Sequence, residues 1–259
     1  MTTATTNGRP TVGVFGLTGC SGDQLVVLNC EDQLLELASL LDLRDFTTAA
    51  SDPDRDTPLD LAFVEGAVVS PRDEATVRRV RERAKCLIAI GSCAVWGGVI
   101  ALDRLFDRAA LLRDIYGDAG AGFNPLPARA VHEVVPVDYA ITGCPIEKDE
   151  FLSAVSQILQ GFPPLAQVNP VCADCRMQEH GCLLLDKGLP CCGAVTLGGC
   201  HARCPALGVA CIGCRGPAPD INVEGTVAAF VAHGIPLEEA RRRLAVFAPL
   251  PEPVLAEVA

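Results

Sequence analysis

Cysteine is concentrated in one short part of this chain. Nine of its 14 cysteines fall between Cys172 and Cys214, in a segment with few aromatic or β-branched residues. Because apolar burial alone would not fold such a segment, we expect a bound inorganic core to organise it. In an oxidising compartment the same cysteines would predict disulfides, but residues 1–10 show no export signal. We therefore expect a cytoplasmic protein whose cysteines bind metal.

The first part of the chain alternates between two patterns. Four short apolar runs rich in β-branched residues alternate with helical patterns. The apolar runs are residues 11–17, 59–69, 85–92 and 137–143. Residues 24–43 have the apolar spacing of a helix, and Ser70 followed by Pro71 begins another. Alternating strands and helices predict a parallel sheet with helices on both faces. The fold we expect here is a flavodoxin-like, doubly wound α/β domain.

A proline-rich stretch, GFPPLAQVNP at 161–170, ends this alternation. We expect two domains, a flavodoxin-like domain over residues 1–162 and a small cysteine-rich iron-sulfur domain over residues 163–259. Helical spacing within 222–247 predicts two helices near the end of the second domain.

Charge and motifs exclude several classes of function. The chain carries 21 basic and 32 acidic residues, a net charge of -11, which argues against a nucleic-acid partner. The arginines of VRRVRERAK and EEARRRL are interpreted as solvated helix faces. No apolar run approaches the roughly 20 residues of a membrane span, so we expect none. Neither of the glycine-rich phosphate-binding loops, G-x-x-x-x-G-K-[ST] or G-x-G-x-x-G, occurs in the sequence.

Three of the predicted strands end beside a cysteine. Cys20, Cys93 and Cys144 follow the first, third and fourth apolar runs. Parallel strands direct their carboxyl ends to one edge of a sheet, where open α/β proteins bind ligands. A single buried cysteine is usually just a small apolar residue, but three at equivalent strand ends favour an iron-sulfur cluster. Cys30 and Cys86 do not follow a strand, and we assign them to the core.

A cubane cluster takes four ligands, so three cysteines leave one iron atom open. Asp23 lies one helical step beyond Cys20 and is placed to fill that position. Three interpretations stay open for Asp23: an iron ligand, a neighbour of a three-iron cluster, or an idle carboxylate. Glu65, after the second run, either accepts a hydrogen bond near the cluster or caps a turn.

The cysteine-rich segment contains two C-x-x-C pairs with further cysteines between them. The thiols are Cys172, Cys175, Cys182, Cys191, Cys192, Cys200, Cys204, Cys211 and Cys214. Eight of them would hold two cubanes and leave one spare, Cys191 or Cys192. Zinc is the competing metal, because C-x-x-C pairs also build zinc ribbons. The many glycines favour iron-sulfur, since their N–H groups can donate to inorganic sulfide.

The quoted motifs resemble a known family. LTGCSGDQLVVLN, DLAFVEGAVVS, AIGSCAVWGGV, TGCPIEKDEFL and PCCGAVTLGGCHARCPALGVACIGCRGP are similar to the small subunits of nickel-iron hydrogenases, which are related to the 20 kDa subunit of quinone oxidoreductases. The likeness is greatest to the cytoplasmic group-3 enzymes, namely sulfhydrogenase delta subunits and methanogen-type small subunits. It covers both predicted domains.

The resemblance implies three 4Fe-4S clusters. It implies a proximal cluster on Cys20, Asp23, Cys93 and Cys144, facing a catalytic large subunit. By chain order we assign the distal cluster to Cys172, Cys175, Cys182 and Cys191, and the medial cluster to Cys200, Cys204, Cys211 and Cys214. Cys192 is then the spare thiol, and exchanges between the last two sets stay open. Asp23 departs from the family pattern, which has cysteine there, and a harder carboxylate donor implies a different cluster potential.

The same resemblance implies an electron relay without substrate chemistry of its own. Dihydrogen would be split at nickel and iron in a separate large subunit. Electrons would then pass through the clusters to a flavin- or iron-sulfur-containing redox subunit. NADP, a deazaflavin coenzyme and a heterodisulfide-type partner all suit such a subunit as acceptors. The alternative is an iron-sulfur electron-transfer or sensory protein that has no hydrogenase activity.

Overall fold

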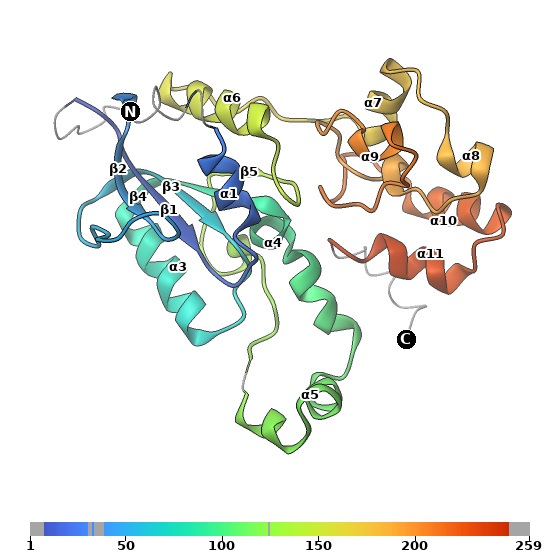
Figure 1. Cartoon of the computed structure of the whole chain (residues 1–259), viewed down its shortest axis with the longest axis horizontal. Helices are drawn as coiled ribbons and strands as arrows, with labels where there is room; N and C mark the ends of the chain where they lie inside the picture. The colour runs from blue at the N-terminus through green and yellow to red at the C-terminus, as the bar shows by residue number, and fades with distance from the viewer. Residues whose placement is uncertain (1–7, 31–32, 34–38, 124, 249–259) are drawn as a thin grey trace. The chain divides into compact units, whose positions relative to one another are not determined.

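The chain forms two compact units in the computed structural model, Met1–Pro164 and Leu165–Ala259 (Figure 1). The structure describes residues 8–30, 33, 39–123 and 125–248. The expected domain boundary between residues 162 and 163 stays a prediction. None of the helices in the described ranges combines the length and the apolar character that crossing a bilayer requires.

Unit 1 is built on a five-stranded sheet in which every neighbouring pair of strands is parallel. The strand order is β2-β1-β3-β4-β5. The strands are β1 (Thr11–Gly16), β2 (Asp42–Phe46), β3 (Leu59–Glu65), β4 (Ala84–Ile90) and β5 (Tyr139–Ile141). This is the flavodoxin-like order, and the direction of winding reverses between β1 and β3. The predicted fold class is confirmed.

Helices cover both faces of the sheet. On one face lie α1 (Gly22–Leu28) and α6 (Lys148–Leu159), and on the other lie α3 (Pro71–Arg83) and α4 (Gly91–Trp96). The connection from β4 to β5 also contains η1 (Gly98–Leu105), α5 (Arg108–Tyr116), η2 (Gly117–Gly122) and η3 (Val131–Glu133).

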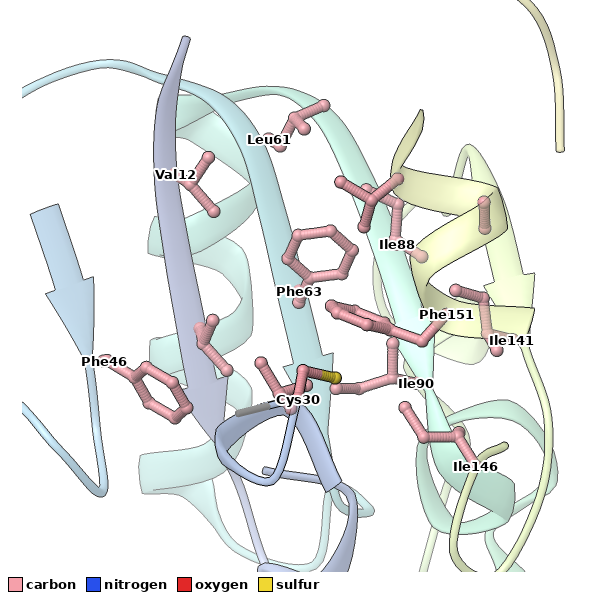
Figure 2. Packing of buried hydrophobic residues seen from close by; sticks show 14 residues of the cluster. Val12, Cys30, Phe46, Leu61, Phe63, Ile88, Ile90, Ile141, Ile146 and Phe151 are labelled. Carbon is pink, nitrogen blue, oxygen red and sulfur yellow. The ribbon is translucent and has the colours of Figure 1, made fainter. Parts of the chain in front are cut away.

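Side chains of the central strands alternate between two cores. Val12, Val14 and Phe63 point to the face of α1 and α6, where the rings of Phe63 and Phe151 lie 5.2 Å apart (Figure 2). Cys30 is fully buried in this core, and Cys86 packs against it as a partly buried side chain. The assignment of these two thiols to the core is confirmed.

One strand and one helix boundary differ from the expectation. The sequence pattern of 24–43 predicted a single helix, but α1 ends at Leu28 and β2 begins at Asp42; residues 31–32 and 34–38 lie outside the described residues. The strand was missed because DLRDF mixes charged and apolar residues. As an edge strand β2 pairs with β1 alone, so it needs less apolar character than the central strands.

The N-terminus of α3 follows the prediction. Ser70 is its N-cap, and the Ser70 side chain accepts a hydrogen bond from the backbone N–H of Asp73 at 3.1 Å. Pro71 begins the helix, where a missing N–H costs nothing.

Unit 2 consists of short helices joined by turns. They are α7 (Val171–Met177), α8 (Leu183–Lys187), η4 (Cys192–Ala194), α9 (Arg203–Ala206), α10 (Val223–Ala232) and α11 (Leu237–Leu244). The last two confirm the helices predicted within 222–247. Both hydrophobic clusters that the described residues form belong to unit 1, so unit 2 depends less on a packed apolar core.

Candidate functional site

Three cysteines and two acids meet at the carboxyl ends of the strands in unit 1. Cys20 lies between β1 and α1, Cys93 lies in α4 directly after β4, and Cys144 follows β5. Burial, together with nearby negative groups, raises the pKa of the Cys93 thiol to about 12. These groups are Cys144, Asp23, Cys20 and Glu65. The structure therefore brings together the four residues that the sequence predicted for the first cluster.

Asp23 connects two of the cysteine loops. Its side chain is 6% exposed, and its Oδ1 accepts a hydrogen bond from the backbone N–H of Ile146 at 2.8 Å. Ile146 lies two residues beyond Cys144, so the carboxyl group of Asp23 fixes the β5 loop against the β1 loop. The pKa of Asp23 is raised to about 7, chiefly by burial and also by the charge of Glu65, while the Ile146 hydrogen bond acts in the opposite direction.

Gly91 brings the third loop up to the same carboxyl group. A Cβ atom at Gly91 would lie 1.8 Å from Oδ2 of Asp23, and the φ angle of Gly91 is 80°. No side chain can occupy that space, and only glycine adopts such a φ angle without strain. Because Cys93 is two residues further along, this close approach places its loop beside Asp23.

Two further glycines lie against the sulfur atoms. A Cβ at Gly22 would come within 3.2 Å of Cys20 Sγ, and one at Gly98 within 2.9 Å of Cys93 Sγ. These positions give the backbone close access to the thiols, as a bulky inorganic cluster requires. Three soft thiolates with one oxygen donor form a set that suits iron bound to sulfide. The residues present therefore fit an iron-sulfur cluster.

Glu65 and Gln24 form a buried polar support beneath this site. Gln24 donates from Nε2 to Glu65 at 2.8 Å and accepts from the Thr48 hydroxyl at 2.7 Å. The backbone N–H groups of Asp23 and Gln24 also donate to Glu65, both at 3.4 Å. Glu65 thus lies beside the thiols and also caps α1. Sequence analysis missed Gln24, because a polar residue in a helical pattern gives no sign of complete burial.

Four cysteines of unit 2 also lie close together. Cys172 and Cys175 share α7, and burial raises the pKa of Cys172 to about 11. Negative charge on three other thiols contributes to this rise: Cys191, Cys175 and Cys182. These are the four residues predicted for the distal set. Cys200 also contributes to the raised pKa of Cys175, after larger effects of burial and of other groups.

The adjacent residues Cys191 and Cys192 have different surroundings. Cys192 is 1% exposed, burial raises its pKa to about 12, and its sulfur lies 4.0 Å from the carbonyl oxygen of Arg243. The sulfur of Cys191 instead accepts a hydrogen bond from the backbone N–H of Cys211 at 3.3 Å. Cys191 therefore lies among the other thiols of unit 2, with a hydrogen bond of the kind that a ligating sulfur receives.

For the four cysteines of the predicted medial set, the structure gives less evidence that the thiols lie close together. Burial raises the pKa of both Cys200 and Cys211, and the electrostatic neighbours of Cys211 are Cys192 and Cys191. Cys204 lies in α9, and Cys214 lies three residues beyond Cys211. In the described ranges, no group of three or more His, Cys, Asp or Glu side chains is arranged to hold a single metal ion.

A buried arginine distinguishes this part of unit 2. Arg215 is 1% exposed, and its Nε donates to the carbonyl oxygen of Gly198 at 2.7 Å. Its positive charge opposes the effect of burial on the pKa of Cys200. Sequence analysis missed Arg215. Arginine is seldom fully buried, and the residue directly follows the Cys211/Cys214 pair, to which the motif was assigned as a whole.

Comparisons with known proteins identify relatives of this chain. A family model described as NADH ubiquinone oxidoreductase, 20 Kd subunit, matches residues 20–158. The chain is 40% identical over 237 residues to sulfhydrogenase 2 subunit delta of Pyrococcus furiosus, covering 92% of this chain and 98% of that protein. It is 29% identical over 233 residues to a subunit of the vhu F420-non-reducing hydrogenase of Methanocaldococcus jannaschii, covering 79% and 81%.

Solved structures share the fold at lower identity. A chain of the [NiFeSe]-hydrogenase from Dm. baculatum matches with a TM-score of 0.59 and 15% identity. The match covers 93% of this chain and 99% of that chain, so the likeness of the fold extends through both units.

Proposed function

The chain belongs to the family of the 20 Kd subunit of NADH ubiquinone oxidoreductase, and we propose that it is the electron-transfer small subunit of a nickel-iron hydrogenase. Relatives that match most of its length are hydrogenase subunits. The observation that carries the proposal is the meeting of three thiols with Asp23 at the carboxyl edge of the sheet. On this proposal the chain relays electrons, and a separate large subunit splits dihydrogen.

The proximal cluster is assigned to Cys20, Asp23, Cys93 and Cys144 as a 4Fe-4S centre. Oδ1 of Asp23 is occupied by the Ile146 N–H, while Oδ2 accepts no hydrogen bond from the residues that the structure describes. Oδ2 lies against Gly91, and among the described residues it has no hydrogen bond that iron binding would have to break. This supports ligation by Asp23 over an idle carboxylate.

Two further 4Fe-4S clusters are assigned to unit 2. The distal set is Cys172, Cys175, Cys182 and Cys191, and the mutual influence of their charges supports it. The medial set is Cys200, Cys204, Cys211 and Cys214, and its support is the resemblance to hydrogenase small subunits. The charge of Cys200 also raises the pKa of Cys175. The alternative assignment to be tested is therefore one in which Cys200 belongs to the distal set.

The chain's own residues hold the ligands and set the charge around them. Bound clusters of this kind take up and release single electrons. In unit 1 the buried Gln24 fixes Glu65, and the Ile146 N–H fixes Asp23, so the cysteine loops keep their positions. Buried carboxyl groups beside the thiols disfavour added negative charge, whereas the guanidinium of Arg215 favours it.

The partners follow from the proposed relay. We expect a large subunit that carries nickel and iron, and a further subunit with flavin or iron-sulfur clusters. NADP, a deazaflavin coenzyme and a heterodisulfide-type partner stay open as acceptors, because the acceptor site lies in another subunit. The cytoplasmic location stays a prediction. A sensor without a nickel subunit is not favoured, since the relatives are hydrogenase subunits.

The native complex provides the test of this function. It would be purified without oxygen, analysed for nickel, and exposed to dihydrogen while its electron paramagnetic resonance (EPR) spectrum is recorded. We expect nickel in a partner subunit and cluster signals that change on reduction by dihydrogen. Reduction of NADP and of deazaflavin would be measured with the same sample. Iron-sulfur clusters that dihydrogen does not reduce, with no nickel in the complex, would contradict the proposal.

Ligation by Asp23 has a separate test with two matched variants. Asp23→Cys supplies a thiolate, which releases more electron density to iron, so the proximal cluster keeps its iron and its reduction potential falls. Asp23→Asn keeps an oxygen that can accept from Ile146 but ligates weakly, so this variant loses about one iron atom per chain. EPR with redox titration and iron analysis distinguishes the two. Spectra identical to the wild type in both variants would exclude ligation.

A further inference from the structure

Unit 1 contains a cavity on the α3 side of its sheet, and none of the cysteines is among the residues that line it. Its volume is about 810 Å³, within the range of sites that hold small molecules. The cavity is lined by the ends of β1 and β2, by the segment between β2 and β3, and by one side of α3. Residues 47–58 form turns and bends with no helix, so α3 alone covers this part of the sheet. The cavity lies beyond strand ends near the reversal of winding, where α/β sheets bind ligands.

Four arginines line this cavity, which we call the arginine cavity. Arg72, Arg79 and Arg83 come from α3, where spacings of seven and four place them on one side of the helix, and Arg55 comes from the segment before β3. Arg83 is engaged, because it donates to the carbonyl oxygens of Asp54 and Thr57. The concentration of positive charge is unusual in a chain whose net charge is -11.

Arg72 and Arg79 are not engaged in this way. Both side chains are exposed, and neither forms a hydrogen bond or ion pair with a residue in the described ranges. Their neighbour Arg78 differs, since it pairs with Glu74 at 2.7 Å and does not line the cavity. Two guanidinium groups therefore remain available to a ligand at the mouth of the cavity.

The acids that line the cavity do not neutralise these two arginines. Oδ2 of Asp73 already accepts hydrogen bonds from the Thr18 hydroxyl at 3.0 Å, the Ser70 hydroxyl at 2.8 Å and the Val69 N–H at 3.2 Å. Asp45 is 8% exposed and lies near Arg83 and Arg55. With four arginines against two acids, the cavity keeps an excess of positive charge.

We propose that the arginine cavity binds a phosphate ester of nucleotide size. Guanidinium groups recognise phosphate through paired hydrogen bonds, and Arg72 and Arg79 are free to make them. Asp45, at the end of β2, can accept a hydrogen bond from a sugar hydroxyl, and Leu17 and Val80 provide an apolar wall for a base. The ligand site uses none of the proposed cluster ligands, although Leu17 and Thr18 belong to the loop that leads to Cys20, and the proposal does not depend on the electron relay.

Calorimetry on the native complex tests this proposal with ADP, adenosine and inorganic phosphate as probes. We expect ADP to bind at least about tenfold more tightly than either adenosine or phosphate, since it alone engages both parts of the cavity. The double variant Arg72→Gln/Arg79→Gln should weaken ADP binding by about tenfold or more. Arg78→Gln, on the same helix but outside the cavity, is the matched control and should leave ADP binding unchanged.

Three binding results, and one structural result, would each overturn the proposal. The binding results are an absence of ADP binding, equal losses in the double variant and in Arg78→Gln, and phosphate binding as tight as that of ADP. A structure of the native complex in which a partner's chain fills the cavity would also overturn it. The visible absorption of the clusters serves as the check on folding, because Arg72 and Arg79 contact none of the cysteines.

Discussion

Unit 1 and unit 2 hold their cysteines in different ways. In unit 1, Cys20, Cys93 and Cys144 extend from a parallel sheet with a packed apolar core on each face. In unit 2, nine cysteines lie on short helices and turns, and no hydrophobic cluster of that size forms among the described residues there. The comparison suggests that unit 1 folds first and then receives its cluster, whereas unit 2 needs its clusters in order to fold.

The charge next to the thiols also differs. Unit 1 buries two acids, Asp23 and Glu65, beside its cysteines, whereas unit 2 buries one acid, Asp174, together with the guanidinium of Arg215 near Cys200. Nearby negative charge makes the addition of an electron harder, and positive charge makes it easier. The surroundings of Cys200 are therefore less negative than those of the cluster in unit 1, which favours a higher potential at Cys200.

The largest expected effect is on folding after cluster removal. Oxidative removal of iron and sulfide from the complex should leave the amide protons of β1, β3 and β4 protected. The amides of residues 165–248 should exchange at least about a hundredfold faster, because their organising core is lost. Hydrogen exchange with mass spectrometry measures both units in one sample. Equal loss of protection in the two units would contradict the comparison.

A pair of adjacent variants tests the ligands of unit 2. Cys191→Ala should lose up to about four iron atoms per chain, because it removes a ligand of the distal cluster. Cys192→Ala should keep all the iron, since that buried thiol lies against the Arg243 carbonyl instead. Iron analysis after anaerobic purification gives the answer. The reverse pattern would assign the ligand role to Cys192.

Arg215 provides a smaller effect within unit 2. Arg215→Leu leaves the Gly198 carbonyl oxygen without its donor, at a cost of about 1–3 kcal/mol to the stability of unit 2. It also removes a positive charge near Cys200, so the potential of the cluster on Cys200 should fall. Arg215→Lys keeps the charge and is the control. A redox titration that shows no difference between the leucine and lysine variants would exclude the electrostatic role.

The smallest expected effect lies in unit 1, at the amino ends of β3 and β4, whereas the proposed cluster ligands lie beyond the carboxyl ends of the strands. Asp60 accepts hydrogen bonds from Thr11 N at 2.8 Å and from Lys85 Nζ at 2.6 Å. Burial tends to raise the pKa of Asp60, but these hydrogen bonds outweigh it and leave the pKa below its usual value. Because Lys85 is half exposed, Asp60→Asn should cost only about 1 kcal/mol at pH 7.

The pH dependence of that cost has a definite sign. Since the folded pKa of Asp60 is lowered, its stabilisation is present above about pH 4, the pKa of an unfolded aspartate, and is lost as the pH falls through the lower folded pKa. The difference between Asp60→Asn and the wild type should therefore vanish in acid. Hydrogen exchange of the amides in β1 and β3 measures this difference in stability as the pH is lowered. A difference that grows as the pH falls would show the opposite linkage.

Local patterns predicted much of unit 1. The apolar runs gave four of the five strands, and the Ser70-Pro71 pair gave the start of α3. β2 was missed because its short charged sequence follows an apolar stretch with helical spacing. The strand-end positions of the three cysteines predicted their meeting, since parallel topology alone brings those ends together.

Features that depend on tertiary proximity could not be predicted. The contact of Gly91 with Asp23 joins residues distant in the chain, and no local pattern indicates it. The arginines of α3 were interpreted as a solvated helix face, and only the absence of a helix in residues 47–58 turns one side of α3 into a cavity wall. The burial of Arg215 likewise depends on how the turns of unit 2 surround it.

The most direct test of the central claim is the inorganic content of the anaerobically prepared chain within its native complex. Three cubanes predict about twelve iron atoms and an equal amount of acid-labile sulfide per chain, with no zinc. A colourless preparation that contains zinc, or iron without sulfide, would contradict the account.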